Sequence, residues 1–194
     1  MKKIFYLFVC FFISFCVVFY FTFPYKTLYQ YLINKNLKNK DFTYYIQTAS
    51  LFTIKLKKIV LPIKDKKINI DYIYAKWNPI YFLLKKNFLR LEIYKSNLKT
   101  SFLCKKQNKS FIITGYIPLK FIQHFSKNYQ FLKKDIFVSI KLNFEKEKIK
   151  LNSIQITGDF ILKGKAYIKN HFFVFNGKLE YRNFKKNVSY YLKI

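Results

Sequence analysis

The pattern of hydrophobic and polar positions divides the chain into two regions. From Ile4 to Phe23, twenty consecutive positions carry no charge, and a helix of that length spans about 30 Å, the thickness of the hydrocarbon core of a bilayer. From Phe42 onward, apolar and polar residues alternate with a period of two, which is typical of half-buried β-strands. The pattern therefore predicts one N-terminal transmembrane helix followed by a body built mainly of strands.

The flanks of the apolar segment distinguish an anchor from a cleaved signal peptide. A cleaved signal has a shorter apolar centre and ends in small residues, whereas this segment ends in bulky residues before Pro24. A lipoprotein signal needs a small residue before the cysteine, and Phe15 precedes Cys16. We therefore expect an uncleaved anchor. Because Lys2 and Lys3 precede it, the N-terminus is expected in the cytoplasm and the rest of the chain across the membrane. The anchoring side chains are expected to include Ile4, Phe8, Phe12, Phe19 and Phe23.

The remaining elements follow from the same patterns. Residues Tyr25 to Leu37 have helical spacing, and two later segments, Asn78 to Lys86 and Leu119 to Leu132, also read as helices. The strand-like runs between them are joined by short polar links, which connect antiparallel neighbours. The sequence thus predicts a meander of about nine or ten strands. Three glycines inside strand-like runs indicate bulges or close backbone approach; they are Gly158, Gly164 and Gly177.

The predicted fold class is mainly β, a curved antiparallel meander with one or two short helices behind the anchor. One face of each strand is apolar and has to be covered by the sheet itself, by a helix or by a ligand. Two architectures are compatible with this: an open groove that suits acyl chains, and a flattened sandwich with an ordinary dry core. The residues expected to line the apolar groove are Ile140, Leu142, Phe160, Leu162, Phe173 and Phe175.

Three regions are expected along the chain. Residues 1–24 form a cytoplasmic tip and the transmembrane anchor, residues 25–40 a juxtamembrane helical segment, and residues 41–194 a periplasmic antiparallel β-domain. A domain of this size has room for one real core or one elongated sheet.

The strong positive charge suggests a nucleic-acid binder at first sight. The chain has 37 basic and 9 acidic residues, a formal net charge of +28. However, only Arg90 and Arg182 are arginines, and arginine is the residue suited to bidentate base and phosphate contacts. Lysine is spread over the whole chain, and Lys, Ile, Phe, Tyr and Asn all have A/T-rich codons, so a biased genome explains the charge. We expect no nucleic-acid partner, although a positive exterior favours anionic membrane surfaces.

The sequence contains no arrangement of residues that is typical of a catalytic site. His124 and His171 stand without a Cys, Asp or Glu at metal-ligand spacing. The closest acidic pair, Glu145 and Glu147, lies in a lysine-rich link and reads as a solvated turn. Cys104 is the only thiol beyond the anchor, so no disulfide can form within the exported part. We expect a protein that is not an enzyme and that uses no cofactor or metal.

The order of features resembles a known family. The anchor ends in Phe23-Pro24, a short amphipathic segment follows, and two further segments run through Ser50–Ile59 and Trp77–Leu84. Glycine-punctuated strands come later, at Ile156–Gly164 and Gly177–Leu179. This layout resembles protein N of the general secretion pathway, an inner-membrane accessory of type II secretion systems. That family is itself similar to the AsmA-like periplasmic β-proteins.

The resemblance implies a single-pass protein of a bacterial inner membrane with a periplasmic β-domain and a role in envelope transport. It supplies no catalytic residues. The leading hypothesis is a non-enzymatic subunit of a type II secretion-like protein transport machine that acts through contacts with other envelope subunits. The alternative is a lipid carrier, AsmA-like or similar to the single-anchor subunit of lipopolysaccharide export, which holds acyl chains in its β-groove. A cytoplasmic nucleic-acid binder is the third hypothesis.

Overall fold

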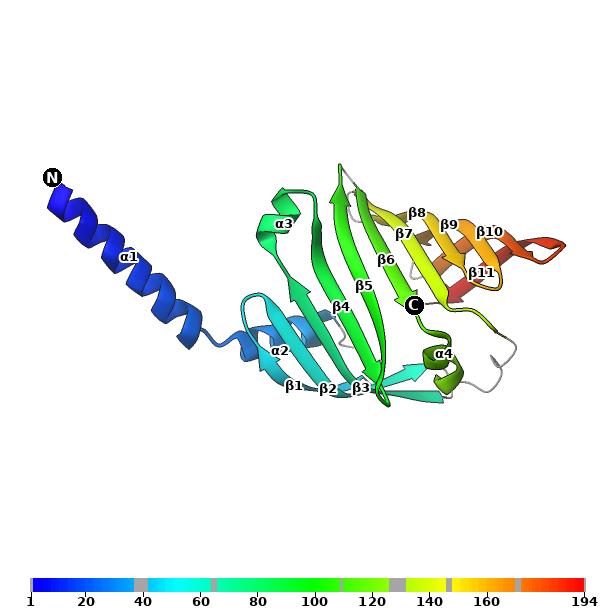
Figure 1. The fold of residues 1–194 in the computed structure, drawn as a ribbon, viewed down its shortest axis with the longest axis horizontal. Coiled ribbons are helices and arrows are strands. Elements are labelled where there is room, and N and C mark those ends of the chain that lie inside the picture. Colours follow the sequence, from blue (N-terminus) through cyan, green and yellow to red (C-terminus); the bar gives the residue numbers. More distant parts are fainter. Residues whose placement is uncertain are drawn as a thin grey trace.

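Two consecutive helices precede the body of the protein. The computed structural model describes residues 2–36, 42–63, 66–108, 110–125, 132–145, 148–169 and 172–193. Helix α1 spans Lys2–Thr22 and helix α2 spans Tyr25–Asn36. Pro24 separates them, because proline disfavours a helical conformation in the residue before it. Figure 1 shows α1 projecting from the body, whereas α2 lies beside the first strands.

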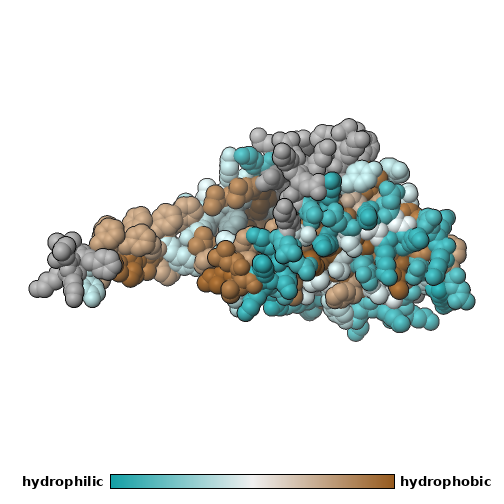
Figure 2. Space-filling model, turned by 90° about the horizontal axis from the view of Figure 1, so that it is seen from above, coloured by the Kyte–Doolittle hydropathy of each residue, from teal (hydrophilic) through white to brown (hydrophobic). Residues whose placement is uncertain are grey.

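The side chains of α1 have few neighbours in the chain itself. Phe8, Phe12 and Phe19 are 66%, 57% and 49% exposed, and Figure 2 shows the corresponding apolar surface protruding from a body whose visible side is largely hydrophilic. Phe23 is partly exposed, and its ring lies tilted against that of Phe19 with centroids 4.9 Å apart. The side chain of Ile4 lies outside the described residues.

The length and composition of α1 and α2 decide whether these helices could cross a membrane. Among the described residues, no single helix is both long and apolar enough to cross a membrane, but Phe8–Thr22 and Tyr25–Lys35, bent by 58°, meet that requirement as a pair. The single-helix anchor expected from the sequence stays a prediction.

The body is one antiparallel sheet whose eleven described strands follow one another in sequence order. This confirms the mainly β, antiparallel meander, with one or two strands more than expected. The strands are β1 (Thr43–Ala49), β2 (Thr53–Ile63), β3 (Lys66–Trp77), β4 (Asn87–Lys95), β5 (Leu98–Gln107), β6 (Ser110–Ile117), β7 (Ile136–Glu145), β8 (Lys148–Thr157), β9 (Ile161–Lys169), β10 (Phe172–Tyr181) and β11 (Phe184–Lys193).

Two short helices interrupt the meander where helical segments were expected. Helix α3 spans Pro79–Leu83, and the side chain of Asn78 caps it by accepting a hydrogen bond of 3.0 Å from the backbone N–H of Ile80. Helix α4 spans Leu119–Phe125. It is shorter than expected, because Leu132 lies in non-helical chain before β7. Part of the expected helix, residues 126–131, falls outside the described residues.

The described strands form one open sheet and not a flattened sandwich, while the groove that suits acyl chains stays a prediction. In the described ladder β1 pairs with β2 and β11 pairs with β10, and the first and last strands do not pair with each other. The accessible surface is 15048 Å², whereas a compact protein of this mass exposes about 9,800 Å². Figure 1 shows the sheet twisting from β1 near α1 to β11 at the far end of the molecule. The larger value includes the exposed side chains of the projecting helix α1, and in the sheet many apolar side chains are only partly buried.

A candidate apolar binding face

Register places the apolar positions of successive strands on the same face of the sheet. Directly opposed residues in antiparallel strands share a face, and three rows of opposed partners cross the sheet. Row one consists of Ala49, Ile54, Ala75, Leu91, Phe102, Gly115, Val138, Ile156, Leu162 and Leu179, from β1 to β10. Row two consists of Trp77, Leu89, Cys104, Ile113, Ile140, Ile154, Gly164, Gly177 and Val188, from β3 to β11. Row three consists of Phe111, Leu142, Leu151, Ala166, Phe175 and Tyr190, from β6 to β11. We call these three rows the apolar face.

The structure brings together five of the six residues expected to line a groove. Ile140, Leu142, Leu162 and Phe175 belong to the three rows. Phe173 lies two residues before Phe175, hence on the same face, and is opposed by Ile168 and Leu192.

The sixth residue, Phe160, is not in a strand. The sequence places it at the start of a strand with Leu162, but β9 begins at Ile161, and Phe160 lies in the link Gly158–Phe160 between β8 and β9. The backbone N–H of Gly158 donates to the carbonyl of Phe160 at 2.9 Å. This bond closes the link, so the expected strand position of Phe160 was wrong.

A cluster of buried apolar side chains on this face lies over β7 to β10. Ile154, Ala166 and Phe175 form a buried cluster. Ile140, Leu151, Ile156, Leu162 and Phe173 are partly buried against it. These side chains come from one sheet, so the curvature of the sheet, and not a second layer, produces their burial. Such burial is incomplete, and most residues of the apolar face keep part of their surface exposed.

Glycines in the rows make room for aromatic rings. Gly164 and Gly177 are direct partners in neighbouring strands, and the ring of Phe175 lies against both of them. The ring of Phe102 lies against Gly115 in the same way. The close approach expected at Gly164 and Gly177 is therefore observed, whereas Gly158 lies just after β8.

Three helices each contact one strand of the sheet. Helix α2 packs on β1, α3 on β4 and α4 on β5. Phe82 of α3 joins the two aromatic residues Phe88 and Phe111, at centroid distances of 5.1 and 6.4 Å. Within the described residues, no helix packs extensively on β6 to β11.

The opposite face carries many lysines and other polar residues as well as exposed aromatic rings such as Tyr116 and Phe137. It also holds an acidic residue that the sequence pattern did not single out. Glu92 in β4 is only 7% exposed. Its carboxylate is 2.5 Å from Arg90 and 2.8 Å from Lys99, and it accepts a hydrogen bond of 2.8 Å from the hydroxyl of Tyr94. The Tyr94 ring stacks on Tyr72 with centroids 4.1 Å apart. Burial raises the pKa of Glu92, but the Lys99 and Tyr94 hydrogen bonds and the Arg90 charge outweigh it and hold the pKa below its usual value.

The other well-placed carboxylates brace links between elements. Asp135 accepts hydrogen bonds from the hydroxyl of Tyr116 and from the backbone N–H of Leu119, the latter at 2.7 Å. Asp159 accepts from the backbone of Lys133 and Lys134. Hydrogen bonds of this kind hold the pKa of Asp135 and of Asp159 below the usual value. Each carboxylate is therefore used to fix a turn.

The described part of the chain contains no group of side chains arranged as a metal site. No group of three or more His, Cys, Asp or Glu side chains among these residues is placed to hold a metal ion. His124 lies in α4 with its Nε2 3.2 Å from the hydroxyl of Ser96, and His171 lies outside the described residues. Cys104 is buried in row two, and burial raises its pKa.

Comparison with known proteins does not extend this description: no family model, no curated protein and no solved structure matches the chain. The resemblance to the secretion protein and to the AsmA-like proteins stays a prediction, and the function has to be argued from the fold.

Proposed function

We propose that the protein is a non-enzymatic, membrane-anchored lipid carrier that holds acyl chains against the apolar face. The observation that supports this most is the continuity of the face. Rows one and two cross nine or more strands with apolar residues or glycine at every position. Most residues of the apolar face are partly exposed, and Trp77 and Tyr190 are 37% and 47% exposed. Apolar surface left in water is unfavourable by about 25 cal/mol per Å². Patches beyond a few hundred Å² mark binding surfaces.

The direction of the face fits transport away from a membrane. The rows run across the strands, from the sheet edge beside α2 toward the sheet edge farthest from α1 (Figure 1). At about 4.8 Å between strands, eleven strands extend about 48 Å along the sheet. With α1 as a single-pass anchor in a bacterial inner membrane and its N-terminus in the cytoplasm, the face leads from the bilayer into the periplasm.

The charge of the protein suits the same substrate. The formal net charge is +28, and lysines occupy the opposite face at Lys55, Lys57 and Lys99, which are opposed to tyrosines in the ladder. A positive surface attracts anionic lipids. Acyl chains on one face and a positive exterior on the other are compatible with a carrier of anionic lipid.

Photocrosslinking tests the proposal on the full chain. The protein is reconstituted in phosphatidylcholine vesicles that contain phosphatidylglycerol with a diazirine near the end of one acyl chain. Irradiation is expected to label residues of rows one to three in β5 to β10. Labelling confined to α1 and α2, with none on the apolar face, would show that the acyl chains stay in the bilayer and would refute the carrier.

A subunit of a type II secretion-like machine is the second candidate. The observation that favours it is the free edge of β11, which pairs only with β10 among the described strands and which offers backbone groups for pairing with a neighbouring subunit. A photoreactive amino acid at Tyr191, which is 68% exposed, is expected to crosslink a β-rich envelope subunit in cells. The same group at the exposed Tyr31 of α2 serves as the control, and equal adducts at both positions argue against edge pairing.

A further inference from the structure

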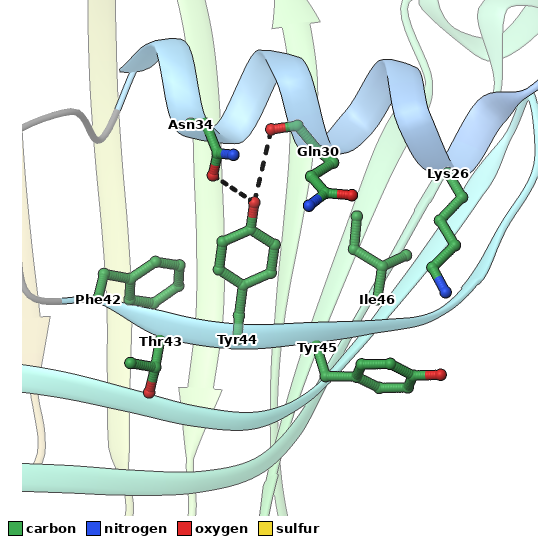
Figure 3. A pocket seen from close by; sticks show the side chains of 8 residues that line it. All are labelled: Lys26, Gln30, Asn34, Phe42, Thr43, Tyr44, Tyr45 and Ile46. Atoms are coloured by element: carbon green, nitrogen blue, oxygen red, sulfur yellow. Dashed lines mark hydrogen bonds between the residues drawn. The ribbon is translucent and has the colours of Figure 1, made fainter.

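A pocket of about 420 Å³ lies between α2 and β1. Its volume falls within the range of small-molecule sites, roughly 300–1,000 Å³. Lys26, Gln30 and Asn34 line it from α2; they are four residues apart, so they share one face of the helix. Tyr44 and Ile46 reach into it from β1. Figure 3 shows these side chains pointing into the gap between the helix and the strand.

The lining favours an anion. Lys26 is the single charged side chain among the eight residues that line the pocket, and none of the eight is acidic. Its ammonium group lies 4.9 Å from the ring centroid of Tyr45, and no carboxylate of the described residues pairs with it. The amide of Gln30 points into the same space (Figure 3). The hydroxyl of Tyr44 donates to Asn34 at 2.7 Å, which holds the far end of the pocket together.

The position of the pocket connects the anchor to the apolar face. Lys26 comes two residues after Pro24, and the Lys26–Asn34 side of α2 extends about 12 Å from there. Ile46 is opposed by Leu56 in β2, and Leu56 lies two residues after Ile54 of row one, hence on the same face. A ligand in the pocket therefore has the end of α1 on one side and the start of the apolar face on the other.

We propose that this pocket binds the phosphate head group of an anionic phospholipid, with Lys26 as the cationic contact and Gln30 as a hydrogen-bond donor. The inference rests on the proposed lipid carrier and adds to it the class of lipid and the point of entry. A membrane lipid fits better than a free anion, because the pocket joins a phosphate-binding lysine to apolar side chains that lead to the first row.

The test uses the full chain in phosphatidylcholine vesicles with phosphatidylglycerol that carries its photoreactive group on the head group. Peptides covering residues 26–46 are expected to be labelled. Lys26→Gln should lower that yield about tenfold, the loss expected for a charge-assisted hydrogen bond. The matched control is Lys35→Gln on the same helix, which lies outside the pocket lining and should keep at least about half of the yield.

The outcomes separate the two proposals. If Lys26→Gln and Lys35→Gln label equally, or if a phosphatidylcholine probe labels as strongly as phosphatidylglycerol, the pocket is not an anionic head-group site. If inorganic phosphate abolishes labelling and chloride at equal ionic strength does not, the site takes free phosphate and the lipid assignment is overturned. If the acyl-chain probe labels the apolar face but the head-group probe does not label residues 26–46, only the proposed head-group site is refuted. If the head-group probe labels residues 26–46 but the acyl-chain probe does not label the apolar face, only the proposed lipid carrier is refuted.

Discussion

The ring of Phe175 occupies the space that a β-carbon on Gly164 would need. A β-carbon built on Gly164 lies 2.5 Å from Cε2 of that ring and also 2.5 Å from the backbone oxygen of Asn176. The missing side chain lets a buried aromatic residue lie against the neighbouring strand, which compensates for the weak strand preference of glycine. The pair thus lies within the buried cluster over β7 to β10.

Gly164→Ala is expected to destabilise the protein by about 1–3 kcal/mol, the usual cost of overpacking, because the backbone oxygen cannot move away cheaply. Gly115→Ala is the matched comparison. Its three nearest atoms all belong to the Phe102 side chain, which can rotate, so the loss should be smaller. Thermal unfolding of the full chain in detergent, followed by circular dichroism, measures both, at roughly 2–4 °C per kcal/mol. Equal melting temperatures for the two variants would contradict the packing argument.

Glu92→Gln is expected to cost about 1–3 kcal/mol of stability, because Glu92 is buried and its carboxylate pairs with the more exposed Arg90 and Lys99 and accepts from Tyr94. Glu180→Gln is the control. Glu180 is 3.7 Å from Lys185 in an exposed pair, so its loss should stay within about 0.5 kcal/mol. Denaturant unfolding at pH 7 compares the two. A larger effect at Glu180 would show that the Glu92 cluster is not a structural brace.

The same carboxylate gives a pH dependence with a defined sign. Its pKa in the folded protein is lowered, so its stabilising contribution is present above the pKa of the unfolded chain, about 4.3. The contribution is lost as the pH falls through the lower folded value. The stability difference between the natural protein and Glu92→Gln should therefore shrink in acid. Unfolding curves at a series of pH values from 7 to below the unfolded pKa measure that difference, and a difference that is constant with pH would count against the ionised form as the source of stability.

Much of the fold could be predicted from the sequence, because period-two patterning predicts strands and short links predict antiparallel order. The register between neighbouring strands could not be predicted, since it depends on where each hairpin turns. For example, β2 continues through Pro62, which is opposed by Lys67, although proline is rare inside a strand. The burial of Glu92 could not be predicted for the same reason. Its position in the strand predicts an outward-facing residue, but cross-strand neighbours, which depend on the register, bury it. The pocket depends on how α2 packs on β1, which no local pattern encodes.

Two neighbouring isoleucines in β6 lie on opposite faces of the sheet, so substitutions at these positions test the two faces separately. Ile113 belongs to row two and is opposed by Cys104 and Ile140, whereas Ile112 is opposed by Lys105 and Lys141 on the other face. Placing an amide against bound acyl chains costs about 1–3 kcal/mol. Ile113→Asn should therefore lower labelling by the acyl-chain probe about tenfold, and Ile112→Asn should leave it unchanged. Equal losses in two folded variants would indicate that the apolar face is not the binding surface.

Removal of residues 2–24 tests whether α1 is the membrane anchor. The deletion takes away the exposed phenylalanines of α1 and leaves the sheet and α2, so the truncated chain should move from the alkali-resistant membrane fraction to the soluble fraction. A double substitution within α1, Phe12→Lys with Phe19→Lys, should weaken membrane retention as well, since lysine at the centre of a spanning helix costs about 2.5–3.5 kcal/mol. Phe184→Lys, at the exposed start of β11, is the control for added charge. A truncated chain that stays resistant to alkaline extraction would place the membrane contact in α2 or the sheet.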